Sequence, residues 1–347
     1  MKKKMFWKNK KVLITGIAGF VGSNLAKNLS SKGANVIGLT KSKKIESLLF
    51  YEKIDKKLNL IFGDITDKIL IKKILIKFKI EIWFHLAAQV EVGLAQKDPY
   101  GTWETNIRGT YTLLEAIREN SKYVKSIIIA SSDKAYGEHG LKKMPYKENY
   151  KLKPIFPYDT SKACADMIAK SYTSNLFNLP IVITRFSNIY GPGQLNFTAL
   201  IPDLIRSSIL NKKFIIRGNG ESIRDYIYID DIVDVYKLLS KKLYTNPKKY
   251  SGEIFNAGTN TPHKTKEIIK KIFLHKGKIN EFKKITIDMK KNKTTGELSI
   301  QYMDFKKLKK YFGWKPKSEF KTNLPKIYNW YESYFKEKYK WQSQLIL

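Results

Sequence analysis

The sequence predicts an α/β fold in which helices cover both faces of a parallel sheet. Short apolar runs rich in Val, Ile and Leu have the near-continuous hydrophobicity of strands that are buried on both faces. Stretches with helical spacing separate these runs, and this alternation is typical of βαβ units and a doubly wound sheet. The expected strands cover residues 11–15, 34–40, 58–62, 82–88 and 126–130, and the clearest helices cover 67–78 and 101–120.

The alternation changes after residue 187. We therefore expect residues 1–187 to form one domain with the doubly wound sheet, and residues 188–347 to form mainly a smaller, mixed α/β lobe. The elements expected in this second part are a helix at 203–210, a strand at 214–217 and charged amphipathic helices at 264–276 and 305–311.

The composition indicates a globular protein. Hydrophobic residues make up 43% of the 347 residues, which is enough for a substantial core. No apolar run reaches the ~20 residues that a membrane helix needs, so we expect no membrane partner. The basic start of the chain lacks the apolar stretch of a secretory signal. A single cysteine, Cys164, cannot form an internal disulfide and suits a reducing compartment, so we expect a cytoplasmic protein.

The chain is strongly basic, with 65 Lys and Arg against 31 Asp and Glu and a formal net charge of +34. Only six of the basic residues are Arg, the side chain that reads bases and phosphates best, and the Lys residues are spread along the chain. We therefore expect no specific nucleic-acid partner. A general attraction for polyanions stays open as an alternative, and the positive electrostatic field of the protein would also attract an anionic substrate.

A glycine-rich turn follows the first expected strand. It stands between that strand and an amphipathic helix, which is the context that a dinucleotide-binding site requires. Glycines let the backbone approach a pyrophosphate, which then lies at the positive N-terminal end of the helix. The sheet is thus predicted to be a Rossmann-type sheet. The residues expected to contact the cofactor in this turn are Gly16, Ala18, Gly19, Phe20, Val21 and Gly22.

The end of the second strand bears on which dinucleotide binds. An acidic residue there would hold the adenosine ribose 2′-hydroxyl of NAD, whereas a basic residue accommodates the 2′-phosphate of NADP. The sequence after Leu39 reads Thr40-Lys41-Ser42-Lys43 and contains no acid. These residues, and above all Lys41 and Lys43, favour NADP, and NAD stays the alternative in so Lys-rich a chain.

Residues 131–162 carry the expected reacting centre. Ser132, Asp133 and Lys134 follow a buried strand, at the edge where open α/β sheets bind their ligands. Tyr158 and Lys162 lie one turn apart on an expected helix, where an ammonium would lower the pKa of the phenol and make it a usable base. Three plainer interpretations stay open: a pair on a helix surface, an Asp133 that caps a turn, and a Lys134 on the protein surface.

Taken together, the motifs resemble those of extended short-chain dehydrogenase/reductases that act on nucleotide sugars. The resemblance covers nearly the whole chain and rests on the order of its motifs. These motifs are Gly16-x-x-Gly19-x-x-Gly22, Gly63-Asp64-Ile65, His85-Leu86-Ala87-Ala88, Asn106-x-x-Gly109-Thr110, the segment from Ser131 to Gly137, Tyr158-x-x-x-Lys162, the segment from Arg185 to Gly193, and the segment from Arg224 to Asp230.

Within that family the residues after Ser132 separate two reactions. Asp133-Lys134 resembles the pair of CDP-glucose 4,6-dehydratases, whereas nucleotide-sugar 4-epimerases lack an acid/base pair there. The resemblance therefore implies a nucleotide-hexose 4,6-dehydratase with a CDP-glucose-like substrate. A 4-epimerase is the alternative, and Tyr136-Gly137 continues like an epimerase or thymidine-diphosphoglucose dehydratase loop. A non-enzymatic dinucleotide- or polyanion-binding protein is a remote third possibility.

The resemblance also assigns roles to the catalytic candidates. Tyr158, assisted by Ser132 and Lys162, would take the proton of the C4 hydroxyl while hydride passes from C4 to the cofactor. Lys134 would remove the proton at C5 of the resulting 4-ketone, and Asp133 would protonate the departing C6 hydroxyl. Hydride would return to C6, which leaves a 4-keto-6-deoxy sugar and a cofactor, NAD or NADP, ready for another cycle.

Further binding residues are implied by the resemblance alone. Those expected at the cofactor are Asp64, Ile65, Leu86, Ala87 and Ala88, and those expected at a nucleotide-diphosphate hexose are Gln89, Asn188, Arg217 and Arg224. The family also implies a homodimer. His85, on an apolar strand, is expected to be a packed core residue, and the histidines show no metal-ligand spacing, so we expect no metal site.

Overall fold

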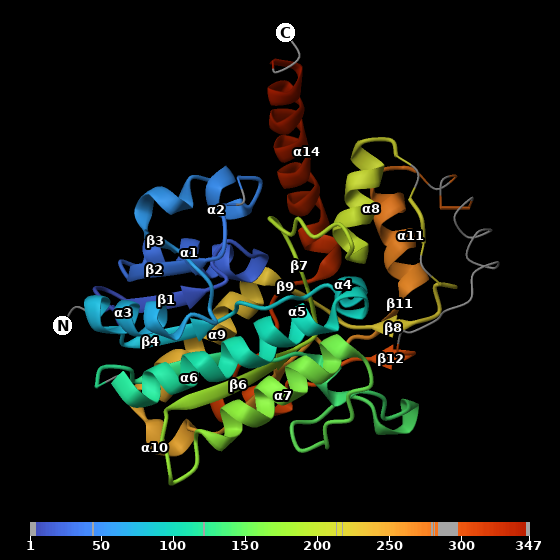
Figure 1. Cartoon of the computed structure of the whole chain (residues 1–347). Coiled ribbons are helices and arrows are strands. Elements are labelled where there is room, and N and C mark those ends of the chain that lie inside the picture. Colours follow the sequence, from blue (N-terminus) through green and yellow to red (C-terminus); the bar gives the residue numbers. More distant parts are fainter. Residues whose placement is uncertain are drawn as a thin grey trace.

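A parallel, seven-stranded sheet forms the centre of the computed structural model (Figure 1). The structure describes residues 5–43, 45–120, 122–212, 214–216, 218–278, 280, 282–283 and 298–344, with side chains to residue 339. The strands follow the order β10-β6-β5-β4-β1-β2-β3. With β4 at its middle and β1 beside it, this order confirms the predicted doubly wound, Rossmann-type sheet. Its strands are β1 (Lys11–Thr15), β2 (Asn35–Thr40), β3 (Asn59–Phe62), β4 (Ile82–His85), β5 (Ser126–Ala130), β6 (Ile181–Phe186) and β10 (Ile254–Ala257).

Helices cover both faces of this sheet. Successive residues of a strand point to opposite faces, so Val12 and Ile14 pack into one core cluster and Leu13 into the other. The first cluster lies under α1 and α9, and the second lies under α3, α6 and α7, which are neighbours in Figure 1. The helices around the sheet are α1 (Phe20–Ser31), α2 (Leu48–Tyr51), α3 (Lys68–Phe78), α4 (Val92–Lys97), α5 (Pro99–Trp103), α6 (Gly109–Asn120), α7 (Pro157–Ser171), α9 (Ile229–Thr245) and α10 (Pro247–Tyr250).

A smaller part of mixed structure stands beyond the carboxyl ends of the central strands. It contains a two-stranded parallel sheet, β7-β9, and a three-stranded sheet, β11-β8-β12. The strands are β7 (Asn188–Tyr190), β8 (Ile223–Arg224), β9 (Tyr226–Tyr228), β11 (His263–Lys264) and β12 (Ile300–Gln301), and the remaining helices are α8 (Leu200–Ile209), α11 (Thr265–His275), α13 (Lys306–Phe312) and α14 (Phe320–Gln344).

Two features differ from the sequence prediction. The chain returns to the central sheet after residue 187, because α9 packs on it and β10 pairs with β6. A single division at residue 187 does not describe this return. The strand expected at 214–217 is wrong for residues 214–216, which form irregular backbone with Phe214 and Ile216 buried in the core. Their hydrophobicity reflects packing, which apolar side chains can achieve on irregular backbone.

The length and polarity of the helices also bear on membranes. Within the described ranges, no helix is both long enough and apolar enough to span a bilayer.

Candidate active site

The glycine-rich turn lies between β1 and α1, as predicted. Gly16 has a φ of +70°, and a Cβ there would come within 2.7 Å of the Ala87 backbone. A Cβ at Gly22 would lie 2.4 Å from the Gly16 carbonyl oxygen. Gly19 is the N-cap of α1 and brings no side chain to the helix end. A bare, close-packed turn at a helix N-terminus has the form that a dinucleotide pyrophosphate needs, so these residues fit such a cofactor.

The predicted cofactor residues after β2 and β3 lie at the same edge of the sheet. Lys41 Nζ lies 3.0 Å from Asp64 Oδ2, and the Lys41 side chain is 80% exposed. Burial opposes ionisation of Asp64, but hydrogen bonds from Thr66 and Lys41 outweigh it and lower the pKa of that carboxyl. Thr40 donates to the Ser42 carbonyl oxygen. Lys43 lies over the Phe50 ring, and Ile65 packs against Gly109.

Asn106 holds the segment after β4, where Leu86, Ala87, Ala88 and Gln89 were predicted. It occupies a π-helical turn, Glu104–Arg108, between α5 and α6. Its Oδ1 accepts from Gln89 N at 2.8 Å, and its Nδ2 donates to Gln89 O at 2.9 Å and to Ser161 Oγ at 2.8 Å. Asn106 thereby ties the β4 end to α7. Only a family motif pointed to Asn106 in the sequence, because its partners are distant along the chain.

The segment after β5 forms a 3-10 turn, Asp133–Tyr136. Ser132 Oγ accepts from Lys134 N at 3.2 Å and donates to Asp133 Oδ1 at 3.0 Å. Ser132 therefore caps this turn, and Asp133 does not. Asp133 is 4% exposed, and its Oδ2 has no hydrogen-bond partner among the described residues. Burial raises the pKa of Asp133, and the nearby charge of Lys134 opposes that shift.

Tyr158 and Lys162 are both buried on α7, and the expected lowering of the phenol pKa is not what the structure has. Burial raises the pKa of Tyr158, and a hydrogen bond with Ser132 only partly opposes this. Lys162 Nζ donates to the Ala130 carbonyl oxygen at the end of β5. Burial lowers the pKa of Lys162 to about 8, with Asp166 acting in the opposite direction. The prediction considered only spacing on the helix, and burial dominates here.

Asp159 is a residue that the sequence analysis did not single out. It is 2% exposed, and its Oδ2 has no partner within the described part of the chain. Burial raises its pKa to about 6, the charge of Lys134 opposes this shift, and Asp133 adds to it. Two buried carboxyl groups and one amino group thus influence one another beside Tyr158. Clusters of this kind concentrate at functional sites.

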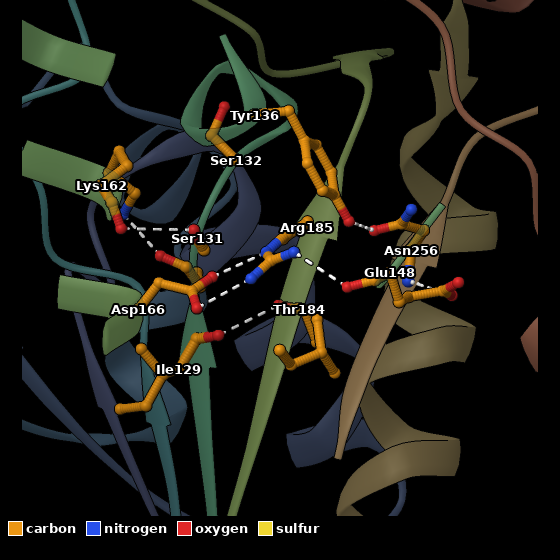
Figure 2. Close-up of polar contacts among 12 residues, drawn as sticks. Ile129, Ser131, Ser132, Tyr136, Glu148, Lys162, Asp166, Thr184, Arg185 and Asn256 are labelled. Carbon is orange, nitrogen blue, oxygen red and sulfur yellow. Dashed lines mark hydrogen bonds and ion pairs between the residues drawn. The ribbon is translucent and has the colours of Figure 1, made fainter. Parts of the chain in front are cut away.

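Arg185 belongs to the scaffold, as Figure 2 shows. Its guanidinium forms two hydrogen bonds with the Asp166 carboxylate, at 2.7 and 2.9 Å, and both side chains are 3% exposed. It also lies 4.6 Å from the centroid of the Tyr136 ring, whose hydroxyl donates to Asn256 Oδ1 at 2.8 Å. The Arg185–Asp166 ion pair therefore joins β6 to α7, and Asn256, the partner of Tyr136, comes from β10.

The predicted substrate residues of the second part lie around β7 and β8. Asn188 Nδ2 donates to the Asp225 carbonyl oxygen at 3.3 Å. Arg224 is 8% exposed and donates to the carbonyl oxygens of Ile223, at 2.9 Å, and of Leu298, at 2.7 Å. The charge of Arg224 also acts on Asp133, so this side chain faces the turn after β5. Arg217 lies outside the described residues.

His85 is a core residue, as predicted. It is 3% exposed, and its ring nitrogens lie 2.9 Å from Thr15 Oγ1 and 3.1 Å from Thr110 Oγ1. Burial lowers its pKa to about 3. The described part of the chain contains no cluster of three or more His, Cys, Asp or Glu residues that could hold a metal ion.

Comparison with known proteins places the chain in a family. The family model for GDP-mannose 4,6 dehydratase matches residues 13–327. A dTDP-D-glucose 4,6-dehydratase of Homo sapiens is 32% identical over 94% of this chain and 91% of the relative. The chain belongs to the GDP-mannose 4,6 dehydratase family. It is an enzyme of the nucleotide-sugar 4,6-dehydratase type, a hydro-lyase, as predicted.

Two further relatives carry the names of different substrates. A dTDP-D-glucose 4,6-dehydratase of Dictyostelium discoideum is 37% identical over 76% of this chain, and the chain spans 61% of that relative. A CDP-glucose 4,6-dehydratase of Salmonella typhimurium is 33% identical over 72% of this chain and 71% of the relative. Family membership therefore fixes the type of reaction and leaves the nucleotide open.

Solved structures share the fold across both reactions considered above. A dTDP-glucose 4,6-dehydratase of Bacillus anthracis in complex with NAD has a TM-score of 0.79 and 28% identity, covering 93% of this chain and 97% of that one. A UDP-glucose 4-epimerase of Thermotoga maritima with UDP-glucose has a TM-score of 0.77 and 27% identity, covering 93% and 99%. The backbone alone does not separate the two reactions, so the residues after β5 matter for the mechanism.

The raised pKa of Asp159 predicts a pH-dependent effect of Asp159→Asn. The pKa lies at about 6 in the folded chain against an ordinary 3.8, so wild-type stability falls as pH rises from the lower value through the upper one. Asp159→Asn should stabilise the protein at pH ~7 by on the order of 2 kcal/mol more than at pH ~4. Urea unfolding at both pH values measures this, and Asp55→Asn reports the effect of the substitution itself. If Asp159→Asn changed the free energy of unfolding equally at both pH values, the raised pKa of Asp159 would be contradicted.

Proposed function

We propose that this enzyme dehydrates a nucleotide-diphosphate hexose through Asp133 and Lys134, with a CDP-glucose-like substrate favoured. The observation that carries the proposal is the buried Asp133 carboxyl, which stands beside Lys134 and Tyr158 and has one oxygen without a partner among the described residues. A 4-epimerase needs no proton transfers at C5 and C6, so it has no use for that pair. The preference for CDP-glucose rests on the resemblance of Asp133-Lys134 to the pair of that group.

The protein side chains would divide the proton transfers among them. When bound, a nicotinamide supplies the acceptor for hydride from C4 and the donor of hydride to C6. Tyr158 takes the C4 hydroxyl proton, with Ser132 bonded to the same hydroxyl, while Lys162, one turn along α7, holds the helix on the end of β5. Lys134 takes the C5 proton. Asp133, which burial favours in its protonated form, gives a proton to the C6 hydroxyl, and water leaves.

The smaller part of the chain, with Asn188 and Arg224, supports binding of the nucleotide diphosphate in this proposal. Both side chains carry N–H donors at the edge of the sheet where the reacting residues lie. Gln89 keeps a buried Oε1 without a partner in the described residues, which leaves it an acceptor for a sugar hydroxyl. The cytoplasm remains our proposed compartment, on the same grounds of a single cysteine.

Replacing Lys134 tests the proposed reaction. Lys134→Met should lower formation of the 4-keto-6-deoxy product by about 100-fold or more, because it removes the base at C5. It should leave the appearance of reduced nicotinamide measurable, whereas Tyr158→Phe should abolish both signals. Alkaline absorbance of the ketone and absorbance of the reduced nicotinamide give the two readouts. Lys142→Met, at an exposed position of the 3-10 turn Leu141–Lys143, is the control. Product formation by Lys134→Met at the wild-type rate would overturn the assigned role.

For the cofactor, we propose NADP in preference to NAD. Residues 40–43 contain no acid, and the exposed Lys41 ammonium at the end of β2 supports a contact with a 2′-phosphate. Asp64 competes for that ammonium at 3.0 Å. Lys41→Ala should therefore weaken NADP binding by about tenfold, the scale of one charge-assisted hydrogen bond, and leave NAD binding unchanged. Calorimetric titration with both dinucleotides measures this, and tighter binding of NAD by the wild-type protein would contradict the preference.

We also propose that the enzyme forms a homodimer through α5, α6 and α7. Large apolar or aromatic side chains are exposed on these helices, namely Tyr100, Trp103, Tyr111 and Met167. The helices lie next to one another on one side of the molecule (Figure 1), so the side chains offer a surface for a second copy. Wild-type protein should sediment as a dimer and Trp103→Glu as a monomer. Monomeric wild-type protein at micromolar concentration would contradict the proposal.

A further inference from the structure

Lys134 has a hydrogen-bond partner from the far end of the chain. Its Nζ donates to Gln301 Oε1 at 3.2 Å, across 167 positions of sequence. Gln301 is 1% exposed and ends β12. We propose that Gln301 is a positioning residue that holds the Lys134 amino group at C5 of the hexose. This inference rests on the proposed function, since it assigns a support to the base of that reaction.

The backbone at Gln301 is fixed from two sides. On one side β12 pairs with β8, and Gln301 stands opposite Arg224. Arg224 also donates to the carbonyl oxygens of Leu298 and Ser299, which lead into β12. On the other side Tyr146 N donates to Tyr302 O at 3.0 Å. A side chain on so constrained a strand can hold its partner in one place.

The orientation of the Gln301 amide follows from the chemistry of its partner. An amino group on Lys134 donates hydrogen bonds in both protonation states, and an ammonium cannot accept one, so the amide oxygen must face it. The Gln301 Nε2 then points away, is buried and has no partner among the residues described. A buried donor without a partner is unfavourable unless something else satisfies it, and a hydroxyl of the bound sugar would do so.

An amide suits this position better than a carboxylate would. A carbonyl oxygen accepts from an ammonium and from a neutral amine alike, so the contact survives the transfer of a proton at Lys134. A carboxylate would instead hold Lys134 in its charged form, which cannot act as a base. Asp133 and Asp159 already face Lys134, Arg224 faces Asp133, and Tyr158 and Tyr146 border the same cluster. Gln301 adds support there without adding charge.

Two substitutions at Gln301 separate positioning from charge. Gln301→Met keeps the length of the side chain and removes the acceptor, and Gln301→Glu keeps the acceptor and adds a charge. Exchange of the C5 proton in heavy water should fall about tenfold or more in Gln301→Met, with reduced nicotinamide still formed. In Gln301→Glu the rising limb of the pH profile for exchange should move up by about one pH unit. Gln96→Met and Gln96→Glu, at an exposed position of α4, are the matched controls.

A measurement without substrate or cofactor accompanies the exchange experiment. Unfolding of Lys134→Met, of Gln301→Met and of the double variant forms a double-mutant cycle, and the two changes should not be additive because they share one hydrogen bond. The inference would be overturned if Gln301→Met exchanged the C5 proton at the wild-type rate and, in addition, either the pH profile of Gln301→Glu were unmoved or the double-mutant cycle were additive. Absence of C5 exchange in the wild-type protein would instead overturn the proposed dehydration, and with it the role of Gln301.

Discussion

Two buried cationic side chains anchor α7 to the central sheet, and the site depends on that anchoring. Lys162 donates to the carbonyl oxygen that ends β5, and Asp166 accepts two hydrogen bonds from the Arg185 guanidinium of β6. Removing one partner of such a buried pair would leave an uncompensated charge, which typically costs about 3–5 kcal/mol. Because α7 also carries Tyr158 and Asp159, these contacts fix the reacting groups relative to the turn after β5.

The second constraint is that the protein's own atoms are enough to bury the acid/base groups. Asp133 and Asp159 each keep a carboxyl oxygen without a partner in the described structure, an arrangement that destabilises the folded chain. Their raised pKa values follow from that burial, with Lys134 opposing the shift in both cases. A proton donor near neutral pH needs this kind of environment. The contact between Lys134 and Gln301 then makes the site a product of both parts of the chain.

Local patterns in the sequence predicted most of the scaffold. The turn from Gly16 to Gly22 was predictable because only glycine permits that backbone approach, and the parallel strands were predictable from their continuous hydrophobicity. Gln301 and Asn106 were not, since each acts on residues far away in the sequence. The predicted lowering of the Tyr158 pKa was also wrong. Spacing shows which side chains share a helix face and says nothing about how deeply the fold buries them.

A structure of the enzyme with an intact nucleotide-diphosphate hexose would show which side chains face the reacting carbons. We expect the hexose to lie with C5 beside Lys134 Nζ and with the C6 hydroxyl beside the Asp133 carboxyl, while Gln301 still accepts from Lys134. A complex in which Lys134 contacts the diphosphate, or in which C5 and C6 point away from Asp133, would contradict this expectation and favour a reaction confined to C4.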